Sequence, residues 1–235
     1  MASFLNATLY RLEKGYKYPK IIKLGSHCES CKKILKWWEL IPIVGYILIR
    51  GKCSKCGQKV NLYYPLSEFL LGVIFVLFFT FSVSWYLWII VLFLFILSYF
   101  DIREQAVYKD LVHVFLAVTI LFYFLSAFDI THLILPIIFS VIIIAINFVK
   151  KSFGFGDLLV LLGLGILMSW QQYLVMFCLG IIIALLYSLI LLISKKISIK
   201  GGKVPMIPFF AISIVITLLY GQQLYYILLN FMKIW

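Results

Sequence analysis

The stretch Gly154-Phe155-Gly156-Asp157 is followed directly by the apolar run LLVLLGLGILM at residues 158–168. It places a carboxylic acid at the entry of a hydrophobic helix, just after two glycines. A charged side chain at the centre of a bilayer costs about 2.5–3.5 kcal/mol on insertion scales, so acids beside membrane helices usually have a function. A second acid, Asp101, ends another apolar run at residues 85–100. We therefore expect the two aspartates to act together at one site.

The composition of the chain is that of an integral membrane protein. Of its 235 residues, 64% are hydrophobic and 13% are charged, whereas about a quarter of a soluble domain is charged. We predict an all-α polytopic membrane fold of about seven transmembrane helices, because a helix satisfies its own backbone hydrogen bonds in lipid. We find no internal repeat. The predicted spans are residues 66–81, 85–100, 111–127, 134–149, 158–169, 173–193 and 205–220, followed by an aromatic tail at 222–235.

A polar segment with two CxxC pairs precedes these spans. Such pairs form disulfides in an oxidising compartment or a tetrathiolate zinc site in a reducing one. About 50 residues bury too little apolar surface to fold unaided, and a structural zinc ion supplies the missing stability. The expected zinc ligands are Cys28, Cys31, Cys53 and Cys56. The predicted domains are an apolar, interfacial segment at 1–12, a zinc module at 13–64 and a membrane domain at 65–235.

The basic residues predict the orientation of the chain. With seven spans, 20 of the 21 lysines and arginines fall on one side of the membrane. They include Lys150, Lys151 and a cluster at 195–203. Positive loops stay in the cytoplasm, so we place the zinc module and both aspartates on the cytoplasmic side of the membrane. The net charge of +12 then reflects contact with anionic membrane lipids, and we expect no nucleic-acid partner.

Two aspartates and one water are sufficient for peptide hydrolysis. One carboxylate removes a proton from the water, and the other donates a proton to the carbonyl oxygen. Gly154 and Gly156 support this role, because glycine lets a substrate strand approach closely. The residues alone leave alternatives open. Both aspartates could be helix-terminal residues in headgroup water, relay groups of a proton-coupled transporter or parts of a non-enzymatic assembly factor.

Several short motifs occur together in the chain: SFLN at residues 3–6, LIP at 40–42 between the CxxC pairs, GFGD at 154–157 and VPMIPF at 204–209. On these motifs the chain resembles the type IV prepilin peptidases, including those that process competence pseudopilins in Gram-positive bacteria. The resemblance implies that Asp101 and Asp157 are the catalytic pair of an endopeptidase that cleaves the short basic leader of prepilins or pseudopilins at the cytoplasmic membrane face. It also implies N-methylation of the new N-terminus with S-adenosylmethionine. No glycine-rich nucleotide motif identifies residues for that step.

The chain departs from the family pattern at several positions. A complete helix usually precedes SFLN, so we expect that the chain begins late. The Phe-Gly of the family's IPFGP segment is replaced by Met206-Ile207, and we expect proteolysis to survive this change. Another GxGD-type membrane protease is the alternative within enzymes, and the zinc module argues against it. A basic leader must approach a cytoplasmic face of the protein that is itself basic, so we expect acidic side chains near the site to attract it. The acids expected to contact the leader are Glu68, Glu104 and Asp110.

Overall fold

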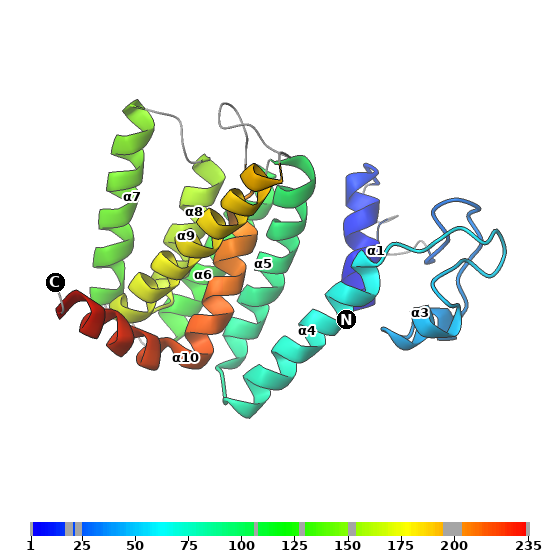
Figure 1. Cartoon of the computed structure of the whole chain (residues 1–235), viewed down its shortest axis with the longest axis horizontal. Helices are drawn as coiled ribbons and strands as arrows, with labels where there is room; N and C mark the ends of the chain where they lie inside the picture. The colour runs from blue at the N-terminus through cyan, green and yellow to red at the C-terminus, as the bar shows by residue number, and fades with distance from the viewer. Residues whose placement is uncertain are drawn as a thin grey trace. The chain divides into compact units, whose positions relative to one another are not determined.

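The computed structural model describes residues 2–16, 21, 25–105, 108–126, 130–149, 154–194 and 204–233. The described chain is mostly helical and divides into two compact units, residues 1–80 and 81–235 (Figure 1). The predicted basic loop residues at 150–151 and 195–203 lie outside the described residues. The elements are α1 (Ala2–Glu13), η1 (Trp37–Leu40), α3 (Val44–Leu48), α4 (Tyr63–Thr80), α5 (Trp85–Glu104), α6 (Lys109–Leu125), α7 (Thr131–Val149), α8 (Phe155–Ile166), α9 (Trp170–Ile193) and α10 (Ile207–Lys233).

In the first unit, α1 packs against α4. Leu9 of α1 is buried, and the Asn6 amide donates a hydrogen bond of 2.8 Å to the hydroxyl of Ser67 in α4. The apolar segment predicted at residues 1–12 is therefore a helix docked on another helix. The sequence suggests a division at residues 64 and 65, where polar chain gives way to apolar chain, whereas contacts such as these group α4 with the N-terminal unit.

Helix α8 lies in the core of the second unit. Seven of its 12 residues are buried, and α6, α7 and α9 pack against it. A Cβ atom at Gly165 would lie 2.2 Å from Cγ of Pro136 in α7, and one at Gly163 would lie 2.9 Å from Phe115 in α6. The absence of a side chain at these glycines allows close helix packing. Their small size brings α8 against its neighbours along most of its length.

Helices α5 and α9 both pack against α10 (Figure 1). Buried Ser213 and Thr217 of α10 donate to carbonyl oxygens of their own helix, at 3.0 and 2.8 Å, so their hydroxyls are satisfied in an apolar core. Helix α10 continues to Lys233 instead of ending near residue 220. Figure 1 shows its last part turning away from the direction of its first part. The predicted tail thus begins as a bent continuation of α10.

Five described helices are long and apolar enough to cross a membrane: α4, α5, α7, α9 and α10. Helices α6 and α8 have 17 and 12 residues, fewer than the roughly 20 of a full crossing. A helix stands at each of the seven predicted positions, but two of them are short. The prediction of an all-α, multi-pass membrane protein is confirmed.

Candidate active site and metal centre

Asp101 lies in the last turn of α5, with 6% of its surface exposed. Its Oδ2 accepts a hydrogen bond of 2.9 Å from the backbone N–H of Ile207, and the N–H of Met206 also donates to this carboxyl. Ile207 is the first residue of α10. The first N–H groups of a helix have no partner within the helix and bind acidic oxygens well. The start of α10 therefore orients the Asp101 carboxyl.

Asp157 is the third residue of α8. Its Oδ2 accepts a hydrogen bond of 3.2 Å from the N–H of Gly154, so it also caps its own helix. Its carboxyl is close enough to Asp101 for the two charges to interact. Figure 1 shows the end of α5 and the starts of α8 and α10 at the same end of the second unit. Two acids that are 56 positions apart in the sequence thus face one region.

The three acids predicted to contact a leader lie in different places. Glu104 and Asp110 are exposed near Asp101 in the sequence, on either side of the link between α5 and α6, and Tyr108 donates a hydrogen bond of 3.3 Å to Glu104. Glu68 belongs to the first unit, where its carboxylate accepts the N–H of Ile43 at 2.9 Å. Ile43 has a φ of +63°, an unusual conformation for a β-branched residue. Glu68 therefore holds a strained turn together.

The four cysteines predicted to bind zinc form one cluster. Their sulfur atoms all lie within 4.8 Å of one another, and the Cys28–Cys56 and Cys31–Cys53 Sγ distances are both 3.8 Å. A tetrahedral zinc ion with Zn–S bonds of about 2.3 Å holds its sulfurs about 3.8 Å apart. The donor set and its spacing therefore fit a structural zinc ion.

Both CxxC pairs adopt the same turn. In each, the N–H of the first cysteine donates to the carbonyl oxygen five residues later at 2.9 Å, and the residue after the second cysteine has a positive φ. An isolated β-bridge closes each turn. This short repeat is not apparent in the amino-acid sequence, because little besides the cysteines is common to its two copies. The matched positions, 25 residues apart, are His27/Lys52, Cys28/Cys53, Cys31/Cys56, Lys32/Gly57, Lys33/Gln58 and Ile34/Lys59.

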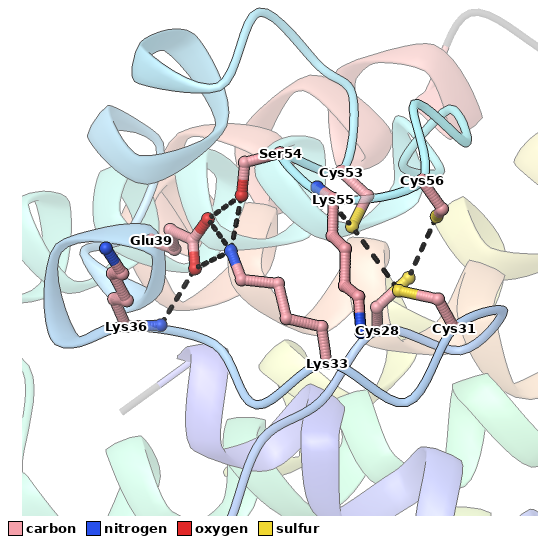
Figure 2. A network of polar contacts seen from close by, with 9 residues as sticks. All are labelled: Cys28, Cys31, Lys33, Lys36, Glu39, Cys53, Ser54, Lys55 and Cys56. Carbon is pink, nitrogen blue, oxygen red and sulfur yellow. Dashed lines mark hydrogen bonds and ion pairs between the residues drawn. The ribbon is translucent and has the colours of Figure 1, made fainter.

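A buried carboxylate ties the two turns together (Figure 2). Glu39 accepts hydrogen bonds from Lys33 Nζ at 2.9 and 3.1 Å, from Ser54 Oγ at 2.6 Å and from the N–H of Lys36 at 2.8 Å. Lys33 follows the first CxxC pair, and Ser54 lies inside the second. Burial alone would raise the pKa of Glu39, but these donors lower the pKa to about 2. Glu39 is therefore an anion at neutral pH and a fixed cross-link.

The thiols differ in acidity. Backbone N–H groups of Cys56 and Lys55 lower the pKa of Cys53 to about 6, so this sulfur is a thiolate at neutral pH. A hydrogen bond from Gln58 favours the Cys56 thiolate, but burial and the neighbouring sulfurs raise the pKa of Cys56 to about 11. A bound dication offsets the repulsion between the negatively charged sulfurs, since it binds all four as thiolates.

Comparison with known proteins assigns the chain to a family. The bacterial peptidase A24 N-terminal domain matches residues 1–82, and the type IV leader peptidase family matches residues 88–189. The chain belongs to the type IV leader peptidase family. The first match ends two residues beyond the first unit, whereas the second match lies within the second unit and contains both Asp101 and Asp157.

The curated relatives of this chain carry the name prepilin leader peptidase/N-methyltransferase. The protein from Neisseria gonorrhoeae is 34% identical over 96 residues, which cover 32% of this chain and 34% of the relative. The protein from Bacillus subtilis strain 168 is 25% identical over 219 residues, which cover 87% of this chain and 85% of the relative. The matches to the proteins from Neisseria gonorrhoeae and Myxococcus xanthus cover only 34% and 22% of the length of those relatives. No solved structure matches the chain.

Proposed function

We propose that this protein is a membrane aspartic endopeptidase that removes the short basic leader of prepilins or pseudopilins. Asp101 and Asp157 are its catalytic residues, and Gly154 and Gly156 support the site. The observation that carries this proposal is that Asp101 in the last turn of α5 and Asp157 in the first turn of α8 belong to helix ends that lie at the same end of the second unit. The family match and the names of the relatives support the substrate class.

In this mechanism the two carboxyls share one proton across a water molecule. The unprotonated carboxylate takes a proton from the water, whose oxygen attacks the scissile carbonyl carbon, while the other carboxyl protonates the carbonyl oxygen. The tetrahedral species then collapses, the C–N bond breaks, and the leaving nitrogen takes a proton from the dyad. The N–H groups of Met206 and Ile207 hold Asp101 in place, so less reorientation is needed during the reaction.

Replacement of each aspartate by asparagine tests the mechanism. The full chain is co-expressed with a pseudopilin, and leader removal is followed by gel shift. Asp101→Asn and Asp157→Asn should each lower the cleavage rate by at least about 100-fold, since each removes an acid–base group. Glu13→Gln is the matched control and should cleave normally. Undiminished cleavage by both asparagine variants would refute the aspartic mechanism.

The zinc ion in this proposal is structural. Cys28, Cys31, Cys53 and Cys56 hold it, and bound zinc contributes folding energy to a unit with a small core. Cys28→Ser and Cys56→Ser should lower the amount of protein that accumulates in the membrane. Cys178→Ser in α9 is the control and should accumulate normally. Full accumulation and unchanged metal content of both ligand variants would contradict the assignment.

The active site and the zinc module face the cytoplasm in this proposal, on the inner or plasma membrane. The asymmetry of basic residues supports this orientation. Glu104 and Asp110 then attract the basic leader, and Glu68 is the third proposed contact. Reversal of Glu104 and Asp110 to lysine should raise KM with little change in kcat, whereas an unchanged KM would dismiss this contact.

The protein also methylates the new N-terminus in this proposal, for which the names of the relatives are the support. S-adenosylmethionine supplies the methyl group when bound. Mass spectrometry of the cleaved pseudopilin tests the activity, since methylation adds about 14 Da to the N-terminal residue. An unmodified amine in the presence of the donor would contradict it.

A further inference from the structure

The two short helices between the CxxC pairs, η1 and α3, carry large apolar side chains on their outer side. The exposed members of this η1–α3 surface are Trp37, Trp38, Ile41, Val44, Ile47 and Leu48. Trp37 is 74% exposed, Ile47 66% and Leu48 60%. Val44, Ile47 and Leu48 have the spacing of one side of a helix. Exposed apolar side chains gathered in this way mark a contact with a partner or with a membrane.

The packing of η1 against α3 explains why these side chains point outward. A Cβ atom at Gly45 would lie 2.5 Å from the carbonyl oxygen of Glu39, so the two helices meet through their backbones. The Glu39 carboxylate turns toward Lys33 and Ser54 (Figure 2). Polar groups and the backbone thus hold this part of the module together. The apolar side chains are not needed for that packing.

Positive charge borders the η1–α3 surface. A hollow of about 390 Å³ is lined by Trp38 and Leu48 together with Lys36 and Arg50. The Lys36 ammonium lies 4.7 Å from the centroid of the Trp38 ring, a cation–π contact that keeps its charge beside an apolar group. Apolar side chains bordered by lysine and arginine are typical of segments that lie in a membrane interface.

The charges of this hollow are unbalanced. Among the described residues that line it, the one carboxylate is Glu39, and Lys33 Nζ already pairs with it at 2.9 Å. Lys36 and Arg50 form no ion pair within the part of the chain that the structure describes. Two cations therefore remain for an anionic partner. A second copy of this surface or the basic leader of a substrate would bring like charge, which is destabilising.

A hydrogen bond holds the η1–α3 surface beside the start of a membrane helix. The N–H of Ile43, which precedes α3, donates to the Glu68 carboxylate of α4 at 2.9 Å. Helix α4 is long and apolar enough to cross a membrane, and Glu68 is its sixth residue, about 7.5 Å from its start. The surface is therefore held at the depth where a spanning helix enters the lipid headgroups.

We propose that the η1–α3 surface docks on the anionic headgroups of the membrane that α4 crosses. Trp37 and Trp38 lie at the interface, where such amphipathic rings are favoured. Lys36 and Arg50 bind the lipid phosphates. The docked surface holds the cysteine module on the bilayer. This inference goes beyond the proposed peptidase function and does not depend on it.

Quenching of tryptophan fluorescence by lipid tests the docking. The full-length, zinc-loaded protein is placed in nanodiscs, one copy in each, whose lipids carry bromine high on the acyl chains. The lipid is phosphatidylcholine alone or its mixture with phosphatidylglycerol. The difference between the wild type and Trp37→Phe/Trp38→Phe gives the emission of this pair. Lipid should quench that emission strongly in the mixture and less in phosphatidylcholine alone, and acrylamide in the water should quench little of it.

Two charge variants identify the groups that bind the lipid, each measured with and without the tryptophan pair. Lys36→Gln/Arg50→Gln should lose most of the quenching by the mixture, because two attracting charges shift the docking equilibrium by about 30-fold. Lys32→Gln/Lys55→Gln is the matched control. It removes the same charge from exposed residues that do not line the hollow, and it should be quenched as the wild type is. Zinc content checks the folding of each variant.

The apolar part of the surface has its own variant. Ile47→Gln/Leu48→Gln changes two exposed side chains, so it removes no core packing, and it should also weaken quenching by the mixture. Undiminished quenching in this variant would overturn the proposed insertion of the surface.

Each remaining outcome also decides the proposal. Equal quenching of the pair in the two lipids, or in the two charge variants, would overturn anionic headgroups as the partner. Emission that acrylamide quenches and lipid does not would place the surface in water, and emission shielded from both would show that protein covers it. Either result would overturn the docking. Leader cleavage is scored separately on the same preparation, so a failure of docking is distinguished from a failure of the peptidase proposal.

Discussion

The two equivalent turns of the cysteine module make the same conformational demand on the residue that follows the second cysteine, although one turn has lysine there and the other has glycine. Lys32 and Gly57 have φ values of +55° and +70°, so both lie in the left-handed region. A residue with a Cβ pays about 1–2 kcal/mol there. A Cβ at Gly57 would meet nothing within 4 Å, so a substitution at this position reports the backbone conformation without a steric clash.

The expected magnitude is the difference between two opposing effects. Alanine in place of glycine restricts the unfolded chain and normally stabilises a protein by about 0.4–1 kcal/mol. The free-energy cost of placing a residue with a Cβ in the left-handed conformation exceeds that gain, so glycine should be favoured by about 1 kcal/mol at both positions. Because zinc binding and folding are linked in such modules, this difference appears in the affinity for zinc. One kcal/mol corresponds to about a 5-fold change in Kd.

The assay is competition for zinc between the purified protein and a chromogenic chelator. Gly57→Ala should bind zinc about 5-fold more weakly than the wild type. Lys32→Gly should bind it about 5-fold more tightly than Lys32→Ala; this pair shares the loss of the lysine charge and differs only in the Cβ. If the alanine variant bound zinc more tightly than the corresponding glycine protein at either position, the equivalence of the two turns and the conformational argument drawn from it would be refuted.

Three other perturbations address separate parts of the structure. Ile207→Pro removes the N–H that binds Asp101, and proline is tolerated at the first position of a helix. Cleavage by this variant should slow by about 10-fold or more with a changed pH profile, whereas Ile207→Val should behave as the wild type. Equal cleavage rates for the two variants would contradict the positioning role of the N–H. Gly165→Ala should lower stability by about 1–3 kcal/mol through overpacking in a thermal melt, and Gly72→Ala, whose Cβ meets nothing within 4 Å, should not. Glu39→Gln should destabilise the cysteine module by about 1–2 kcal/mol in denaturant unfolding. Because the folded-state pKa of Glu39 is lowered to about 2, the difference in stability between wild type and variant should be full above pH 4.5 and should disappear as the pH falls toward 2. A difference in stability that does not depend on pH would argue against the ion pair.

Hydropathy and cysteine spacing predict much of this molecule. Apolar runs place a helix at each expected position, and two CxxC pairs identify four sulfurs that converge in the structure. The alternation of loops between the two sides of the membrane predicts that Asp101 and Asp157 lie at one membrane face. Such signals are local in the sequence, and each depends on one type of side chain.

The remaining features depend on contacts that leave no pattern in the sequence. The donor to Asp101 is a backbone N–H at Ile207, 106 residues away, and any residue other than proline provides that group. Arg11 counts in the sequence as one more basic residue before the first span, yet it is buried. Its Nη1 donates to the carbonyl oxygen of Ile21 at 2.6 Å, and hydropathy gives no indication of that contact.

The division into two units has a consequence for how such proteins diverge. The acids assigned to cutting belong to one unit, and the four cysteines assigned to zinc belong to the other. Substitutions that weaken the metal cluster therefore leave the acids themselves unchanged, and the two units can accumulate changes separately. A descendant that keeps Asp101 and Asp157 but loses Cys28 would retain the groups for cleavage while less of the protein accumulates.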